Sequence, residues 1–234
     1  MTETLTLESV TARAVLLPLA RPVVARIATI EQWPLILIDL HTREGITGRA
    51  YLEPYVPKSM QYLIPAHNDL AEMFRGRPVV PVDMYDQARK SLHFVGYEGL
   101  AMIAVAGFDM AAWDALARAA DLPLCEFLGG SRAPVLSYNS NGLWLSEPAA
   151  VAAEAVELRE EGGFQGLKLR MGRTRVKDDI ATFEAVRNSV GDDMALMVDF
   201  TQGLNRAAAL YRCHALDDLG LCLLYTSPSP RDRG

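Results

Sequence analysis

The sequence predicts an α+β domain followed by a partial α/β barrel, with the boundary near residue 133. Before that boundary, β-rich segments come first and helical periodicity follows, which is typical of an α+β unit. After it, strands and helices alternate with a repeat of roughly thirty residues, which favours parallel strands joined by right-handed crossovers. We therefore expect one domain over residues 1–133 and a second over residues 134–221.

The elements of the first domain follow from two kinds of periodicity. Thr42 to Gly45 is typical of a hairpin turn, because glycine readily adopts the positive φ angle that such turns need. Alternation of apolar and polar residues predicts strands over 10–17, 35–41 and 45–52. Apolar residues at three-to-four spacing predict helices over 58–75 and 83–92. A stretch rich in Ala, Met, Leu and Trp predicts a third helix over 97–119.

The second domain is expected to contain three strand–helix units. The strands are predicted over 135–138, 166–171 and 194–200, and the helices over 148–161, 176–190 and 206–219. A doubly wound sheet and a (β/α)₈ barrel share this pattern, but no G-x-G-x-x-G follows the first strand, which counts against a dinucleotide-binding sheet. A whole barrel needs about 200–250 residues, so three units form only an incomplete one.

Composition excludes several classes of function. The net charge is −6 and the basic residues are scattered, so we expect no nucleic-acid partner. Three irregularly spaced cysteines predict neither a disulfide framework nor a zinc site. The longest apolar runs are too short to span a bilayer, and the polar start is unlike a signal peptide. We expect a cytoplasmic protein without a membrane partner.

The final segment departs from the pattern. The string from Cys222 to Asp232 matches one reading frame of a transposase-type sequencing-library adapter. We therefore expect residues 222–234 to be a non-native tail that packs poorly, apart from accidental strand pairing by residues 223–226. A natural Ser/Pro-rich tail is the alternative.

Three charged residues lie where a barrel would carry its chemistry. Lys168 and Arg170 share one face of a predicted strand, because strand side chains alternate, and two cations facing the core need an anionic partner. Asp199 ends the next strand, and barrel active sites lie at that end. Its carboxylate suits a hard cation such as Mg²⁺. The alternatives are a solvated strand face for the cations and a turn or helix cap for the aspartate.

Three segments, residues 100–116, 123–130 and 191–199, carry a resemblance to a known family. On these segments the chain resembles the mandelate racemase / muconate lactonizing enzyme family of the enolase superfamily, and is most similar to its mandelate-racemase-like members. Residues 100–116 are similar to the long helix that joins capping domain to barrel, and residues 123–130 to the segment that follows it. Residues 191–199 are similar to the family's third barrel strand. The resemblance implies a capping domain and the first three βα units of a barrel, truncated before the active site is complete.

The resemblance also implies roles for these residues. Asp199 matches the first Mg²⁺ ligand, and Lys168 matches the first lysine of the family's Lys-x-Lys motif, which lowers its partner's pKa and contacts the substrate carboxylate. Arg170 replaces the second lysine, which is the general base on one face of the substrate. An arginine stays protonated and is a poor base, although it can clamp a carboxylate or act as a base in a dry pocket.

Substrate contacts are expected from three further residues. Thr201 stands where mandelate racemase has a substrate-contacting asparagine. Ser140 lies in the segment that differs from the racemase's histidine-bearing first-strand motif. Arg26 lies on a predicted capping loop over residues 21–31, where it could meet an acidic or hydroxylated substrate. These departures count against mandelate itself as the substrate.

The implied activity of the full-length parent is Mg²⁺-assisted removal of a proton α to a carboxylate. The outcome would be racemisation of a 2-hydroxy acid or dehydration of an acid sugar, and Arg170 favours dehydration because it leaves one base. The parent is expected to bind a small carboxylate substrate and to form a homo-oligomer. A different hypothesis is that the chain, as it stands, is a catalytically inactive fragment or a non-enzymatic interaction module.

Overall fold

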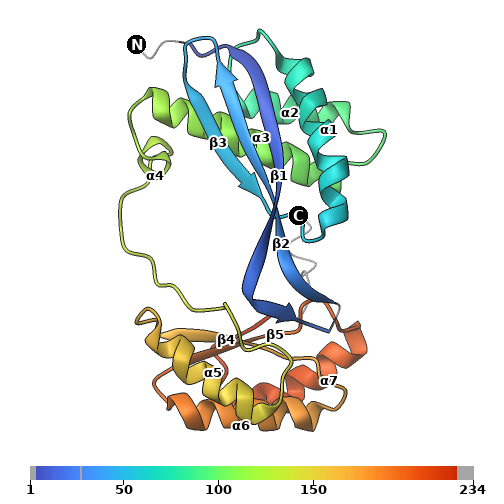
Figure 1. Cartoon of the computed structure of the whole chain (residues 1–234), viewed down its shortest axis with the longest axis vertical. Coiled ribbons are helices and arrows are strands. Elements are labelled where there is room, and N and C mark those ends of the chain that lie inside the picture. The colour runs from blue at the N-terminus through green and yellow to red at the C-terminus, as the bar shows by residue number, and fades with distance from the viewer. Residues whose placement is uncertain (1–3, 27, 226–234) are drawn as a thin grey trace. The chain divides into compact units, whose positions relative to one another are not determined.

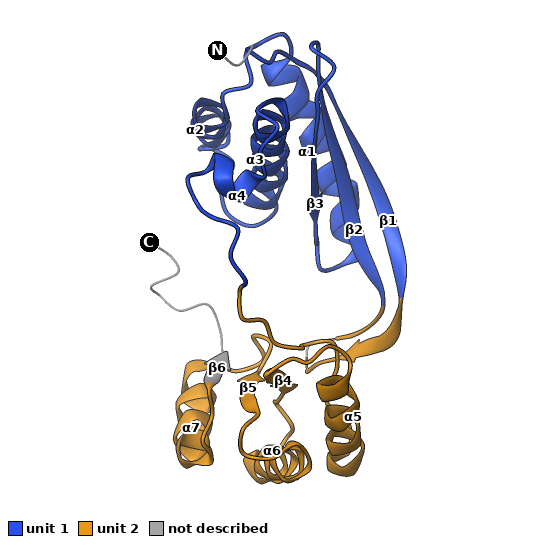
Figure 2. Cartoon of the chain, turned by 90° about the vertical axis from the view of Figure 1, so that its left-hand side faces the viewer, with its two compact units in different colours: residues 1–18, 32–134 blue, residues 19–31, 135–234 orange. Residues whose placement is uncertain are grey.

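The chain folds into two compact units in a computed structural model that describes residues 4–26 and 28–225. One unit comprises residues 1–18 and 32–134, and the other comprises residues 19–31 and 135–234 (Figure 2). Residues 19–31, which the sequence analysis assigned to the first domain, therefore belong to the second compact unit. The long strands β1 (Leu7–Val24) and β2 (Thr29–Thr42) contribute residues to both units.

The first unit is built on a three-stranded sheet in the order β1–β2–β3. Its strands are β1 (Leu7–Val24), β2 (Thr29–Thr42) and β3 (Thr47–Leu52). Strand β2 alternates buried and part-exposed residues along its second half, so that Ile36, Ile38 and Leu40 enter the core. The predicted hairpin turn is confirmed: Gly45 has φ 84°, and its N–H donates to the Thr42 carbonyl at 3.1 Å.

Four helices follow the sheet. They are α1 (Pro57–Phe74), α2 (Pro81–Ser91), α3 (Leu100–Ala119) and the short α4 (Leu124–Phe127). Figures 1 and 2 show α1 to α3 on one face of the sheet. The rings of Phe74 and Phe108 stack with their centres 5.5 Å apart in the core between α1 and α3. All three long helices were predicted within a few residues of these bounds.

Close packing of α3 against β3 explains the alanine-rich sequence of this helix. A Cβ atom added at Gly48 would lie 2.0 Å from the Ala111 carbonyl oxygen and 2.8 Å from the Ala115 Cβ. The small residues therefore let the two backbones approach directly. By length and composition alone α3 could cross a membrane, but eight of its residues belong to the buried set of this unit.

The second unit alternates helices with parallel strands. In chain order it contains α5 (Pro148–Glu160), β4 (Gly166–Arg170), α6 (Val176–Val190), β5 (Ala195–Asp199), α7 (Arg206–Leu216), the 3₁₀ turn η1 (Asp217–Leu219) and β6 (Leu223–Tyr225). The sheet order is β4–β5–β6, and each neighbouring pair is parallel. Helix α6 has the bounds that the sequence predicted, and α5 and α7 differ from prediction only at their C-terminal ends.

The strand predicted over residues 135–138 is wrong. Val135 and Leu136 are 86% and 89% exposed, and the chain first pairs with β4 at Asn139, through a single parallel bridge to Leu167. The Asn139 side chain accepts the Asn141 N–H at 3.0 Å, and this local turn ends the pairing after one residue. The three-unit count is therefore not confirmed, and the region is a partial barrel-like sheet.

The segment predicted to be a non-native tail is described only in part. Residues 223–225 form β6, which pairs in parallel with residues 197–199 of β5. We expected strand pairing for residues 223–226, and it is confirmed for residues 223–225. Residues 226–234 lie outside the described residues, so the origin of the tail stays a prediction.

Candidate active site

The two faces of the β4–β5 sheet have opposite character. Leu167 and Leu169 of β4, together with Leu196 and Val198 of β5, are fully buried in the apolar core of this unit. Because strand side chains alternate, Lys168 and Arg170 project from the other face. The parallel register pairs Arg170 with Asp199, the last residue of β5. The charged groups therefore lie on the face opposite the apolar core.

Lys168, Arg170 and Asp199 converge at the C-terminal ends of the two strands. The Asp199 Oδ2 atom lies 3.5 Å from Lys168 Nζ and 3.7 Å from Arg170 Nη1. These distances confirm the convergence that strand alternation predicted. The side chains retain only 14%, 10% and 19% exposure for Lys168, Arg170 and Asp199, so water screens the charges incompletely. Their individual roles stay predictions.

The turn after β5 orients the Asp199 carboxylate. The backbone N–H of Thr201 donates to Asp199 Oδ1 at 2.7 Å, while Oδ2 faces the two cations. Thr201 and Gln202 both have left-handed backbones, with φ 49° and 57°. Such conformations are costly for residues other than glycine, and they cluster at functional sites. The strained turn therefore holds Asp199 in one orientation.

Arg170 is the most buried member of the cluster. Its guanidinium carbon lies 4.7 Å from the centre of the Trp144 ring, a cation–π contact. Burial lowers the pKa of Arg170 below its ordinary value, and the negative charge of Asp199 opposes this shift. The Nη1 atom is buried and makes no hydrogen bond to any residue that the structure describes. A buried, charged guanidinium with an unpaired N–H donor attracts an oxygen anion.

Lys168 has a second contact besides Asp199. Its Nζ atom lies 5.5 Å from the centre of the Tyr138 ring. Tyr138 thus borders the site from the segment that runs beside β4, although that segment is not a strand.

Of the three predicted substrate contacts, two lie in or against the loops that follow the strands. Arg26 Nη1 donates to the Gly172 carbonyl at 3.2 Å. A Cβ atom added at Gly203 would lie 2.8 Å from Arg26 Cδ, so this side chain crosses the loops after β4 and β5. Thr201 belongs to the turn that holds Asp199. Ser140 is half-buried in the loop beside β4. Contact of these residues with a substrate stays a prediction.

A buried charge network that the sequence analysis missed supports the β4–α6 loop. The fully buried Asp179 carboxylate accepts N–H bonds from Gly172 at 3.1 and 3.2 Å and from Arg173 at 3.1 Å, and it also binds Arg212 Nη1. Helical spacing in the sequence could have indicated this network. Asp179 lies three and four residues before Thr182 and Phe183, so it belongs to the buried face of α6.

A second network, centred on Arg21, was also missed. The Arg21 guanidinium donates to Glu161 Oε1 at 2.5 Å and lies 3.6 Å from Glu154 on α5. The hydrogen bond from Arg21 lowers the pKa of Glu161. Glu154 in turn accepts the N–H of Leu143 at 2.8 Å. Arg21 therefore ties residues 19–31 to α5 and to the loop that carries Trp144.

The described residues suit Mg²⁺ only in part. A hard cation of this kind binds several oxygen ligands, and Asp199 supplies one carboxylate of the right kind at the right end of the sheet. In the described part of the chain, no group of three or more His, Cys, Asp or Glu side chains gathers as a metal site would require. This portion can therefore contribute one ligand but not a complete site.

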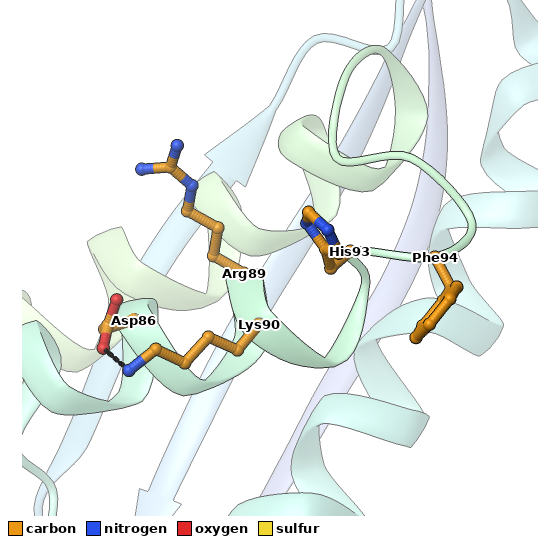
Figure 3. A pocket seen from close by; sticks show the side chains of 5 residues that line it. All are labelled: Asp86, Arg89, Lys90, His93 and Phe94. Atoms are coloured by element: carbon orange, nitrogen blue, oxygen red, sulfur yellow. Dashed lines mark ion pairs between the residues drawn. The ribbon is translucent and has the colours of Figure 1, made fainter.

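Two surface depressions lie outside this cluster. One, of about 590 Å³, lies between residues 145–148 and the loop at 172–175 in the second unit. Another, of about 450 Å³, is in the first unit, where Figure 3 shows Asp86, Arg89, Lys90, His93 and Phe94 around it. Lys90 pairs with Asp86 at 2.5 Å there. Both are open surface features, and neither brings together the residues of the candidate site.

Comparison with known proteins identifies the class. Residues 8–129 match the N-terminal domain of the mandelate racemase / muconate lactonizing enzymes, and residues 150–225 match the enolase C-terminal domain-like family. The fold and the charged strand ends thus define a member of the enolase superfamily. Within it, the chain belongs to the mandelate racemase / muconate lactonizing enzyme family.

The similar proteins are enzymes. The chain is 32% identical over 213 residues to L-talarate/galactarate dehydratase of Salmonella typhimurium. The aligned residues make up 88% of the chain and 53% of that enzyme. It therefore spans about half the length of this curated relative.

Two solved structures add magnesium to this comparison. One is an enolase from alpha pretobacterium bal199 with bound Mg, which is 62% identical to the chain with a TM-score of 0.91. The match covers 94% of the chain and 62% of that protein. The other is an enolase from Bradyrhizobium complexed with magnesium and mandelic acid, which is 35% identical to the chain with a TM-score of 0.88. The match covers 96% of the chain and 62% of that protein.

Proposed function

We propose that this chain forms the capping domain and the start of the barrel of a Mg²⁺-dependent enzyme that removes a proton α to a carboxylate. One observation carries the proposal: Lys168, Arg170 and Asp199 converge at the C-terminal ends of adjacent parallel strands. The resemblance to magnesium-bound relatives agrees with this chemistry. The expected substrates are small carboxylates.

Each residue of the cluster has a chemical part in this proposal. Asp199 would be one ligand of the metal, which supplies positive charge that stabilises the anion formed when the proton leaves. Lys168 would place a second positive charge beside the substrate carboxylate. Arg170 would stay protonated and bind an anionic oxygen rather than accept a proton, because a guanidinium keeps its proton in proteins although burial lowers the pKa of Arg170. The base would come from outside the described residues.

Dehydration of an acid sugar is the outcome that the site favours. With Arg170 in place of a lysine, only one base is available, and dehydration needs proton removal from one face. The identity to L-talarate/galactarate dehydratase supports this choice. Racemisation of a 2-hydroxy acid is the alternative, which the structural likeness to the mandelic-acid complex supports.

A second candidate concerns the 234 residues alone. Because the described residues gather no group of three metal-binding side chains, we propose that this chain by itself turns over little or no substrate. The full-length parent is expected to be cytoplasmic and to form a homo-oligomer. Size-exclusion chromatography with light scattering would test the oligomeric state.

The test is exchange of the substrate α-proton with solvent deuterium, followed by NMR over a panel of acid sugars and 2-hydroxy acids. The full-length enzyme, recovered from an overlapping nucleotide read, should show Mg²⁺-dependent exchange that Asp199→Asn abolishes. Residues 1–234 should show none. Exchange by the full-length enzyme that survives Asp199→Asn would refute the assignment of the site.

A further inference from the structure

Two neighbouring side chains of the candidate site each carry a buried hydrogen-bond donor without an acceptor. They are Arg170 Nη1 and Trp144 Nε1, and neither bonds to any residue that the structure describes. Their side chains are in contact, since the Arg170 guanidinium carbon lies 4.7 Å from the Trp144 ring centre. A buried donor without an acceptor costs about 1–3 kcal/mol, and more when it is charged. Two such donors together point to a missing acceptor.

The carboxylate of Asp199 does not fill this role. Its Oδ2 atom lies 3.7 Å from Arg170 Nη1, which is too long for a hydrogen bond, and its Oδ1 atom accepts from Thr201. The aspartate therefore offsets the charge of Arg170 without accepting a hydrogen bond from Nη1.

The backbone at Leu143, directly before Trp144, is held in place by two hydrogen bonds. Leu143 has a left-handed conformation with φ 54°, although its side chain is fully buried. Its N–H is held by Glu154, and its carbonyl accepts the Arg170 N–H at 2.9 Å. A strained residue fixed on both sides is typical of a functional loop rather than a free connection.

We infer that Arg170 Nη1 and Trp144 Nε1 together bind one carboxylate group, with Trp144 as a binding residue. A carboxylate has two oxygens and accepts two donors side by side. Both nitrogens are covered in the described structure, so the half-buried indole must shift to admit the ligand. That the ligand is the carboxylate of a substrate rests on the proposed function, whereas the binding itself does not.

The test is a titration of the ¹⁵N-labelled 234-residue chain with sodium glycolate at constant ionic strength. The chain has three tryptophans and so three indole N–H resonances, which Trp144→Phe and Trp113→Phe assign. We expect a saturable shift of the Trp144 resonance only. Arg170→Met should weaken the apparent affinity about tenfold, as loss of a charge-assisted hydrogen bond predicts. Trp113 packs against Phe127 in the other unit, so Trp113→Phe is the matched control.

Three outcomes would overturn the inference. One is no saturable shift of the Trp144 resonance at glycolate concentrations on the order of 100 mM, which would fill even a site of about 10 mM affinity. Another is an equal shift with neutral glycolamide. The third is an undiminished shift in Arg170→Met, or in Arg170→Lys if the methionine variant does not fold. Failure here, with α-proton exchange intact in the full-length enzyme, would leave the proposed function standing.

Discussion

Asp179 and Arg212 form a buried ion pair between α6 and α7, with side-chain exposures of 0% and 7%. Arg212 also donates to the carbonyl oxygens of Arg173 at 2.7 Å and Thr174 at 3.3 Å. The pair therefore holds the loop that begins two residues after Arg170. The conformation at the end of β4 depends on two helices that follow it in the chain.

Removing one partner of this pair should destabilise the chain strongly. Arg212→Met would leave the Asp179 carboxylate buried with only neutral donors and the more distant Arg173, and we expect a loss of about 3–5 kcal/mol in the free energy of unfolding. Urea unfolding followed by circular dichroism measures it. The double variant Asp179→Asn with Arg212→Met should recover part of this loss. A single-variant effect below about 1 kcal/mol would contradict the buried network.

The contact of β3 with α3 predicts that Gly48→Ala is destabilising. The added Cβ would meet the Ala111 carbonyl oxygen at 2.0 Å, so the strand and the helix must separate. We expect a cost of about 1–3 kcal/mol or more, as for other overpacked sites. Arg49→Ala, at an exposed side chain on the same strand, is the control and should change stability by about 0.5 kcal/mol or less. Equal melting temperatures for the two variants would argue against this packing.

The Arg21–Glu161 pair predicts a dependence of stability on pH. Because Arg21 lowers the pKa of Glu161 in the folded chain, the pair contributes stability above the unfolded-state pKa of that glutamate. This contribution is lost as the pH falls through the lowered folded-state pKa. The difference in unfolding free energy between the wild type and Glu161→Gln should therefore shrink on acidification. Glu160→Gln, whose carboxylate pairs with Arg159 instead, is the matched control and should show a weaker pH dependence.

Replacing Arg170 by lysine should add a second base in the full-length enzyme. A lysine beside Lys168 can lose its proton near neutral pH, whereas an arginine cannot. We expect Arg170→Lys to speed α-proton exchange from the opposite face of the substrate, by about tenfold or more given the usual effect of a positioned base. Deuterium exchange of the two enantiomers, measured separately, distinguishes the faces. An unchanged ratio of their rates would count against one-base chemistry in the natural enzyme.

Local pattern alone was enough to predict much of this protein. The periodicity of Val176–Val190 predicted α6 to the residue, since its apolar face and flanking breakers lie within one window. Alternation along β4 placed Lys168 and Arg170 on one face, and the parallel repeat placed Asp199 next to them. These features depend on neighbours close in sequence, so the sequence specifies them directly.

Only the tertiary structure decided which distant groups meet. Residues 135–138 have the composition of a strand, but they come before the single bridge to β4 at Asn139, and Val135 and Leu136 stay exposed. Arg21, near the end of β1, reaches Glu161 across 140 positions. Trp144 packs on Arg170 because the loop that carries it is bonded to α5 and β4. No periodicity encodes such partners, since each depends on where a separate segment packs.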